Sequence, residues 1–397
     1  MTSSVYIAKN VYGGDGLGRL GDGRVVFVPG AWAGEQVKAE IVEEKRHFVK
    51  ARLVEVVEPS PDRVDGSATA VPGMVYANLS YEGELKAKER QLREFFERAR
   101  IPTGGDIVRG ASPARPLNYR SKVVYHFAKH GDAWRIGYRA EPSHEVVDVP
   151  QDPLARPEIN AKLAEIRRSV TMLLTTGPMQ VRRETERKGD VTVRWTRKSG
   201  VKWWIGDAPK DMALRETTCG IDFEMPAGGF YQVNPEVGEE LVKAVVVEYG
   251  KGAEKAPNIL DLYCGVGVFG LCCKPPVLVG VESGREAVEF AKRNAAACGM
   301  PAALFFPDQV ERSVRRLKAG PAMTAIVDPP RGGMEPSVPK WLVGSGVSRI
   351  LCVSCDPATM MRDLKTLSQA YSVESVRWFD MFPRTARFET LVALRRR

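Results

Sequence analysis

The 397-residue chain is predicted to be an α/β protein: a doubly wound sheet preceded by a small β-barrel and a mostly β middle domain. From residue 229 to 397, short apolar strands alternate with helical patterns, which is typical of a parallel sheet covered by helices. Residues 1–58 hold short β-rich runs separated by Gly-rich turns. Residues 59–228 return to a β pattern in KVVYHFAK and DVTVRWTR. These shifts predict three domains with boundaries near residues 58 and 228.

The composition favours a reducing compartment and a polyanionic partner. Hydrophobic residues make up 44% of the chain, the net charge is +9, and basic residues concentrate between Arg115 and Lys202. A basic surplus of this kind fits nucleic acid. Seven cysteines without framework spacing indicate free thiols. No signal peptide or membrane-length apolar run is visible, so we predict a cytoplasmic protein without a membrane partner.

The first domain is expected to be a barrel of the OB type. Its strands are RVVFVPG, EQVKAEIVEE and HFVKARLVEVVE, and the segment Pro59–Pro61 ends it as a linker. The Gly-rich segment Gly13–Gly18 is not followed by a helical pattern. We therefore expect a hairpin turn there rather than a phosphate-binding loop.

The middle domain combines one amphipathic helix with basic strands. In residues 80–100, apolar residues recur at helical spacing, and this helix could pack on the last domain. A second helix is expected near 157–175. Trp195, Trp203 and Trp204 alternate with Arg and Lys. They could stack on bases or belong to a core, and for each of them the core is favoured.

A cofactor site is predicted where the strand NILDLYC runs into a Gly-rich turn. Gly265 and Gly267 allow the backbone to turn tightly and approach a ligand. Glu282 ends the next strand, where a carboxylate can accept hydrogen bonds from ribose hydroxyls, and Asp308 falls where an adenine contact is expected. A nicotinamide site is the alternative, but the D-x-x-C-G-x-G form, the V-E pair and the later D-P-P favour S-adenosylmethionine.

The catalytic candidates follow the next strands. Asp328 begins the rigid Asp-Pro-Pro-Arg turn beside the cofactor crevice. Cys355 lies between a strand and a helix, and a helix N-terminus stabilises a thiolate. One methyl transfer that needs both a thiol nucleophile and a base is the methylation of carbon 5 of uracil. Carbon 5 accepts the methyl group only after a nucleophile adds to carbon 6, and a base must then remove the carbon 5 proton. Glu389, at the start of the last strand, is the base candidate.

Each catalytic candidate also has an ordinary structural interpretation. Cys352 and Cys355 form a C-x-x-C spacing, which could indicate zinc or redox chemistry. No second such pair or His cluster accompanies it, so we predict no metal. A glutamate before a strand is usually a solvated edge residue. The combination of Cys355, Glu389 and the Asp-Pro-Pro-Arg turn is what favours catalysis.

Over nearly its whole length the chain resembles the S-adenosylmethionine-dependent RNA 5-methyluridine methyltransferases, a family of RNA (uracil-C5) methyltransferases. The resemblance rests on GFYQVN, DLYCGVGVFG, VDPPR, SCDPAT and FPRTARFE, which follow one another in family order. It implies a class I Rossmann-like methyltransferase domain behind an OB-like TRAM barrel. The resemblance also implies roles for individual residues: Gln232, Tyr263, Glu282, Asp308 and Asp328 at the cofactor or site, Cys355 as nucleophile and Glu389 as base.

Three departures from the family pattern stand out. Val268 replaces a common Asn, and Arg387 stands where many members carry His. Many TRAM-bearing members also hold an iron–sulfur cluster through four cysteines. At those spacings this chain has Ser67, Gly73, Tyr76 and Asp152. A cluster requires thiolates, so we predict that none is bound.

The resemblance implies methylation of a specific uridine in RNA, with ribosomal RNA (23S) favoured over transfer RNA because of the TRAM module. RNA is the expected partner, and no obligate protein partner is evident. A non-catalytic RNA-binding or folding factor, or an RNA methyltransferase acting on another atom, are the alternatives. The intact Cys355, Glu389 and Asp-Pro-Pro-Arg turn argue against the non-catalytic factor.

Overall fold

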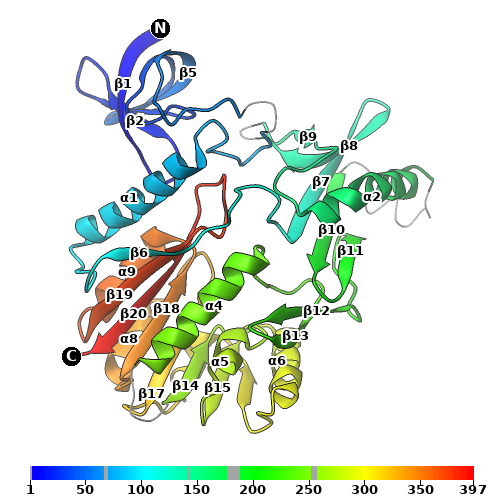
Figure 1. The fold of residues 1–397 in the computed structure, drawn as a ribbon, viewed down its shortest axis with the longest axis vertical. Helices are drawn as coiled ribbons and strands as arrows, with labels where there is room; N and C mark the ends of the chain where they lie inside the picture. The colour runs from blue at the N-terminus through cyan, green and yellow to red at the C-terminus, as the bar shows by residue number, and fades with distance from the viewer. Residues whose placement is uncertain (1, 67–69, 141–142, 177–187, 252–256) are drawn as a thin grey trace.

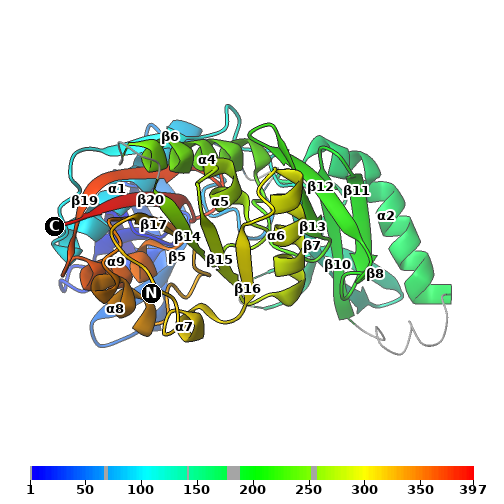
Figure 2. The same ribbon diagram turned by 90° about the horizontal axis from the view of Figure 1, so that it is seen from below.

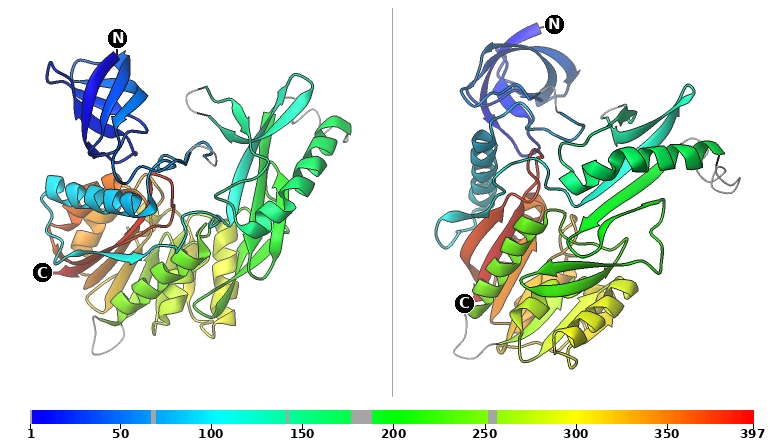
Figure 3. Two further views of the ribbon diagram at one scale, coloured as in Figure 1. Left: turned by 45° about the horizontal axis from the view of Figure 1, so that its top comes forward. Right: turned by 45° about the vertical axis from the view of Figure 1, so that its right-hand side comes forward.

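The computed structural model describes residues 2–66, 70–140, 143–176, 188–251 and 257–397. Three β-containing parts make up the molecule (Figure 1). A barrel at the N-terminus and a central sheet both rise from one side of a large mixed sheet, as the two views of Figure 3 show. This arrangement confirms the predicted fold class.

The N-terminal barrel closes in the strand order β1-β2-β3-β5-β4. Its strands are β1 (Thr2–Asn10), β2 (Gly16–Arg19), β3 (Val25–Val28), β4 (Gln36–Glu44) and β5 (Phe48–Glu58). Alternate residues of these strands, among them Val5, Ile7 and Val26, fill the barrel's core. Gly13 and Gly14 have φ angles of 109° and 99° in the turn between β1 and β2, so the predicted hairpin turn is confirmed.

The central sheet has the order β11-β10-β7-β8-β9. The strands are β7 (Lys122–His130), β8 (Ala133–Arg139), β9 (Val146–Asp148), β10 (Lys188–Thr196) and β11 (Gly200–Ile205). Helix α2 (Pro157–Thr176) covers one face through Ile159, Leu163 and Ile166. A two-stranded hairpin, β12 (Ala213–Thr218) and β13 (Ile221–Pro226), leads toward the large sheet.

The tryptophans of this central part belong to apolar clusters, as the favoured interpretation predicted. Trp204 is buried, and Trp195 and Trp203 are half-buried against the core under α2. Trp195 also lies beneath the guanidinium of Arg156, whose central carbon is 4.0 Å from the ring centroid. These contacts account for all three side chains without a bound base.

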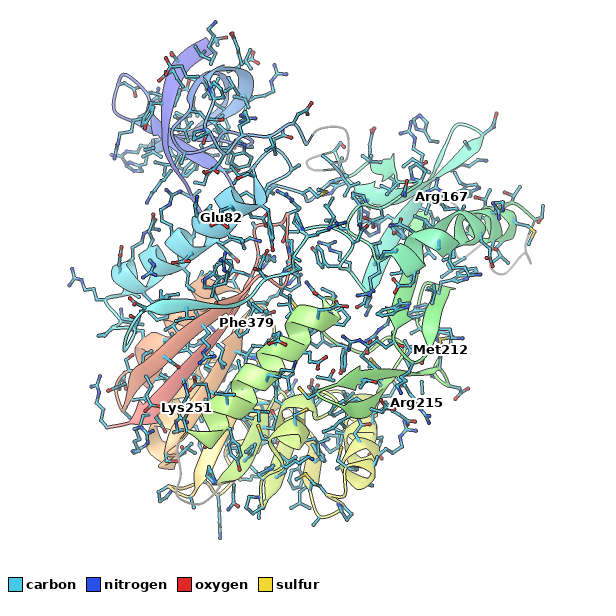
Figure 4. All side chains as sticks on the ribbon, viewed as in Figure 1. Glu82, Arg167, Met212, Arg215, Lys251 and Phe379 are labelled. Atoms are coloured by element: carbon cyan, nitrogen blue, oxygen red, sulfur yellow. The ribbon has the colours of Figure 1, made fainter. Side chains whose placement is uncertain are left out.

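Part of the positive charge of the central region is paired. Arg167 contacts Asp148 at 2.6 Å, and Arg215 contacts Glu224 at 2.6 Å. Figure 4 places Arg167 on α2 and Arg215 on β12, both on the side of the molecule away from α1. The basic surplus of the sequence is therefore partly neutralised within the fold.

The large sheet has eight strands in the order β16-β15-β14-β17-β18-β20-β19-β6. The strands are β6 (Ile107–Ala111), β14 (Asn258–Leu262), β15 (Leu278–Glu282), β16 (Leu304–Pro307), β17 (Met323–Val327), β18 (Arg349–Ser354), β19 (Tyr371–Phe379) and β20 (Glu389–Arg396). Helix α4 (Pro235–Gly250) precedes β14. The helices that follow strands of this sheet are α5 (Val268–Cys273), α6 (Arg285–Ala297), α7 (Val310–Ser313), α8 (Ser337–Ser345) and α9 (Pro357–Leu367).

Helices cover both faces of this sheet. Helices α4, α5 and α6 lie on one face, and α7, α8 and α9 lie on the other (Figure 2). The chain order of the strands reverses between β14 and β17, which are neighbours. In an open α/β sheet, ligands bind at the carboxyl ends of the strands beside such a reversal.

Helix α1 (Tyr81–Ala99) packs on the large sheet rather than on the central one. Leu85, Leu92 and Phe96 share a core with strands of the large sheet, and β6 extends that sheet beside β19. The fully buried Lys88 contacts Glu84 and Asp380, each at 2.7 Å. The helix α1 and the strand β6 therefore pack with the last domain, although their residues fall within the predicted range 59–228. The domain boundaries at residues 58 and 228 stay predictions.

None of the helices in the described ranges combines the length and the apolar character that crossing a lipid bilayer requires.

Candidate active site

Four of the predicted residues meet at one end of the large sheet. Val327 pairs with Leu262 in β14 and with Cys352 in β18, so the residues that follow these strands emerge side by side. Across the antiparallel pair of β18 and β20, Ser354 stands opposite Thr390. Tyr263, Asp328, Cys355 and Glu389 are thus brought together at this end, although 126 positions separate the first from the last.

A pocket with about 570 Å³ of empty space opens beside this group. Four predicted cofactor residues line it: Gln232, Tyr263, Gly265 and Asp328. The further lining residues are Thr218, Phe230, Tyr231, Pro235, Gly238, Glu239, Val242, Cys264, Val266, Val268 and Phe269. Phe230, which no sequence argument singled out as a site residue by itself, is 71% exposed. Such an exposed aromatic at a pocket suits contact with a flat ligand.

The Gly-rich turn forms one wall through unusual backbone angles. Tyr263, Gly265 and Gly267 have φ angles of 64°, 54° and 88°. Tyr263 is the exception here, because a residue with a Cβ rarely adopts the left-handed region. At Gly265 the place where a Cβ would stand has no atom within 4 Å, so a ligand can approach the backbone there.

Asp261, in the strand before this turn, is hydrogen-bonded to the helix that follows it. Its Oδ2 accepts a hydrogen bond from the Gly270 N–H at 3.0 Å, while its buried Oδ1 has no partner among the described residues. Burial raises the pKa of Asp261 to about 7. A protonated carboxyl at this position avoids placing an uncompensated charge in the core.

Three other predicted cofactor residues lie around the pocket without lining it. Glu282 ends β15, and its Oε2 accepts a hydrogen bond from the Gly265 N–H at 3.2 Å. Gly267 is the N-cap of α5. Asp308 follows β16, its N–H donates to the Glu282 carbonyl at 3.0 Å, and its Oδ2 accepts from Ser313. Glu282 and Asp308 are therefore adjacent at the ends of neighbouring strands.

Cys355 lies directly before the N-terminus of α9, as expected, but its other surroundings act against the thiolate form. Burial, and after it the negative charges of Glu389 and Asp328, raise the pKa of Cys355 to about 12. Arg331 and Arg387 act in the opposite direction. The helix N-terminus is outweighed because desolvation penalises the charged thiolate more strongly.

The carboxyl groups facing Cys355 are themselves held toward their neutral forms. Glu389 is 4% exposed, its Oε2 has no hydrogen-bond partner among the described residues, and burial raises its pKa well above the usual range. Burial raises the pKa of Asp328 as well. Arg331, an exposed residue of the Asp-Pro-Pro-Arg turn, lowers the pKa of Glu389. A buried carboxyl with a raised pKa is suited to proton transfer near neutrality.

One contact at this site comes from the N-terminal barrel and was missed by the sequence analysis. The Tyr12 hydroxyl donates a hydrogen bond to Asp356 Oδ2 at 3.3 Å. The two residues are 344 positions apart, and no periodic pattern or motif links them. Only a structure could reveal this contact.

The positions at which the family resemblance led us to look for iron–sulfur cysteines make other contacts. Tyr76 is buried and accepts a hydrogen bond from Gln91 at 3.1 Å. Asp152 is buried and accepts hydrogen bonds from the hydroxyls of Tyr125 and Tyr138. Ser67 lies outside the described residues. Within the described ranges, no three His, Cys, Asp or Glu side chains are grouped as metal ligands.

Comparisons with known proteins agree with this geometry. Residues 309–397 match the family described as tRNA (Uracil-5-)-methyltransferase, and residues 5–54 match the TRAM domain. An uncharacterized RNA methyltransferase of Caldanaerobacter subterraneus subsp. tengcongensis is 30% identical over 96% of this chain and 95% of that protein. A tRNA (uracil(54)-C(5))-methyltransferase of Schizosaccharomyces pombe is 29% identical over 96% of this chain and 76% of that protein.

A solved structure shares the fold over nearly the whole chain. It is the crystal structure of Pyrococcus abyssi tRNA (uracil-54, C5)-methyltransferase in complex with S-adenosyl-L-homocysteine, with a TM-score of 0.74 at 22% identity. The match covers 98% of this chain and 100% of that one. The barrel, the central part and the large sheet therefore recur together as one architecture.

Proposed function

Because the chain belongs to the RNA (uracil-C5) methyltransferase family, we propose that it methylates carbon 5 of a uridine in RNA through a covalent Cys355 adduct. The observation that carries the proposal is that Cys355 and Glu389 directly follow and begin the paired strands β18 and β20, at the sheet end where Tyr263 and Asp328 line the pocket. The alternative of a non-catalytic RNA-binding factor gives no reason for a thiol and a buried carboxyl to meet there.

The pocket fits S-adenosylmethionine as the methyl donor. The open space at Gly265 leaves room against the backbone, and the Glu282 and Asp308 carboxylates can accept hydrogen bonds from hydroxyl and amino groups. Gln232, Tyr263 and Asp328 would contact the cofactor from the pocket walls, and Gly267 shapes the turn beside it. When bound, this cofactor supplies a methyl group on a positively charged sulfur.

Cys355 and Glu389 would act in sequence on the uracil ring. The Cys355 sulfur forms a bond to carbon 6 and its thiol proton is released, which makes carbon 5 nucleophilic enough to accept the methyl group. Glu389 then takes the proton from carbon 5, the bond between sulfur and carbon 6 breaks, and the ring double bond re-forms. Overall the uridine gains a methyl group and one proton is released.

The electrostatics of the free site set one condition on this sequence. Burial favours the protonated form of Glu389, and the carboxyl must be deprotonated before it can serve as a base. Arg331 and Arg387 lower the pKa of Cys355, and a neutral Glu389 removes one negative charge that raises it. The protonated form of Glu389 therefore favours the first step, and its deprotonated form is needed for the last.

The RNA substrate we propose is transfer RNA. The relatives above whose names specify a target act on uracil 54 of tRNA. The expectation of ribosomal RNA, which rested on the TRAM module alone, has no support among these comparisons. The barrel and the central part would hold the RNA through phosphate contacts. The target base would turn out of its loop to reach the pocket.

The test combines the purified protein, S-adenosylmethionine with a tritiated methyl group, and total RNA from cells lacking the gene. We expect label in 5-methyluridine of tRNA-sized RNA. Cys355→Ala should abolish labelling while cofactor binding persists, and Cys298→Ala, a change at another free thiol, should label normally. Label in ribosomal RNA would correct the substrate, and label in another nucleoside would refute the uridine assignment.

A second variant tests the role of Glu389. Glu389→Gln retains the size of the side chain but cannot accept the carbon 5 proton. The bond between Cys355 and the RNA should then persist and appear on a denaturing gel as a slower band. An inactive Glu389→Gln protein without such a band would place the defect before proton removal and contradict its role as the base.

A further inference from the structure

We propose that Tyr12 of the N-terminal barrel is a positioning residue for methyl transfer, because its hydroxyl fixes Asp356 and thereby the helix end next to Cys355. The inference rests on the proposed function and adds a role for the barrel beyond holding RNA. In this proposal the barrel contributes a residue that helps to position the catalytic thiol.

Tyr12 reaches the site from the turn between β1 and β2. Its hydroxyl donates to Asp356 Oδ2 at 3.3 Å. Its ring meets Phe95 of α1 edge-on, with 5.5 Å between ring centroids, and meets Phe388 edge-on at 6.1 Å. Phe388 directly precedes the proposed base Glu389. One side chain of the barrel thus touches the segments that carry both the nucleophile and the base.

Asp356 connects Tyr12 to the position of Cys355. Asp356 Oδ1 caps α9 by accepting hydrogen bonds from the N–H groups of Ala358 and Thr359 at 3.0 and 3.1 Å. Its other oxygen, Oδ2, faces Tyr12 and lies 3.6 Å from Arg387 Nη1. Both carboxyl oxygens of Asp356 therefore have partners, one in α9 and the other in Tyr12 and Arg387. Cys355 is the residue directly before Asp356 in the chain.

Arg387 alone does not complete this arrangement. Its Nη1 is buried and makes no hydrogen bond to another described residue, so its contact with Asp356 is an ion pair at longer range. Among the described residues, Tyr12 is the hydrogen-bond donor to Oδ2. Loss of that hydroxyl would leave the orientation of Asp356 to a longer, less directional contact.

The turn that carries Tyr12 is clamped between the barrel and α1. Gln91 Nε2 of α1 donates to the Val11 carbonyl at 3.0 Å. Asn10, at the end of β1, donates to the carbonyls of Gly14 and Ala31 at 3.3 and 2.9 Å. The position of the barrel on α1 is therefore transmitted to Asp356 through a short, partly buried chain of contacts.

The first experiment compares Tyr12→Phe with Tyr6→Phe, a change at a 59% exposed tyrosine of the same barrel. Tyr12→Phe retains the ring contacts and removes the hydroxyl. We expect kcat to fall by about 3- to 10-fold, with KM for the RNA and for S-adenosylmethionine unchanged. Tyr6→Phe should retain the wild-type kcat.

A double-mutant cycle tests whether Tyr12 acts through Asp356. Asp356→Ser retains a good N-cap for α9 but removes the oxygen that Tyr12 reaches. In that background, Tyr12→Phe should have little further effect on kcat. Additive effects of the two substitutions would overturn the connection.

A readout without methyl transfer separates this inference from the proposed function. The rate at which iodoacetamide alkylates Cys355 in the RNA-free protein, followed by mass spectrometry, should rise in Tyr12→Phe because a looser helix end exposes the thiol. The rate at Cys298 in the same protein should not change. If no RNA is methylated but this rise occurs, the proposed function fails and the positioning contact stands.

Two outcomes would overturn the inference. One is a Tyr12→Phe protein whose kcat and Cys355 alkylation rate match those of Tyr6→Phe. The other is a higher KM for RNA with an unchanged kcat, which would make Tyr12 an RNA contact instead.

Discussion

Replacing Lys88 with methionine is expected to destabilise the protein by about 3–5 kcal/mol, because it removes the buried ammonium that pairs with two buried carboxyl groups. The Lys88 ammonium is fully buried and donates to Glu84 Oε1 and Asp380 Oδ1, each at 2.7 Å. Burial alone would lower the pKa of Lys88, but the two carboxylates outweigh it and the pKa is raised. The lysine is therefore charged, and this charge is what the substitution removes.

The surroundings keep the cost within that range. Methionine fills most of the space of the lysine stem, so no large cavity forms. Glu84 retains the backbone N–H of Arg384 at 2.7 Å, and Asp380 retains the Tyr81 hydroxyl at 2.7 Å. Glu84 can also take up a proton, since burial already raises its pKa.

Urea unfolding at neutral pH measures the effect, with Lys86→Met as a control at an exposed position of the same helix. The control should change the free energy of unfolding by less than about 0.5 kcal/mol. Adding Glu84→Gln and Asp380→Asn to Lys88→Met should recover part of the stability, because the two buried carboxyl groups are then neutral, while Arg384 loses its ion pair with Glu84. If Lys88→Met behaves like the control, the buried cluster does not hold α1 to the segment before Glu389.

The pH dependence supplies a second check. In Lys88→Met, the folded state should bind a proton at Glu84 more tightly than the unfolded state does, so stability should fall as pH rises. The deficit relative to the wild type should therefore be smaller near pH 5 than near pH 8. A deficit that does not vary with pH would contradict the loss of a charge partner.

Three further predictions follow from the site. Alkylation of Cys355 in the free protein should accelerate about tenfold per pH unit from pH 7 to 10, because its pKa is raised to about 12; a plateau near pH 7 would contradict this. The pKa of Asp261 is raised to about 7, so the folded protein binds an extra proton and loses stability as pH rises from roughly 4 to 7. Asp261→Asn should remove this slope from urea midpoints, and an unchanged slope would assign it to another group. In filter binding, the logarithm of the RNA association constant should fall linearly with the logarithm of salt concentration, whereas salt-independent binding would exclude a phosphate-dominated interface.

The local patterns of the chain were enough to predict most helices and strands. A helix expected at residues 80–100 is observed at Tyr81–Ala99, and one expected near 157–175 is observed at Pro157–Thr176. Strand β19 was not predicted, since its burial pattern does not alternate regularly. Strand β6 was also missed, because its pairing with β19 joins segments more than 260 positions apart.

The sequence by itself determined the chemistry of the site: a thiol and a Gly-rich turn at the ends of apolar strands, and the Glu389 carboxyl at the start of another. Parallel strands end at one edge, so the thiol and the Gly-rich turn had to lie near each other. Glu389 joins them because β20 runs antiparallel to β18. Only the tertiary structure decided the pKa values of these groups and the contacts that position them. The raised pKa of Cys355 depends on desolvation and on carboxyl groups from other strands, and the contact of Tyr12 with Asp356 depends on how the barrel docks. Local periodicity reports the environment of neighbouring residues, whereas desolvation and long-range contacts are set by segments distant in the chain.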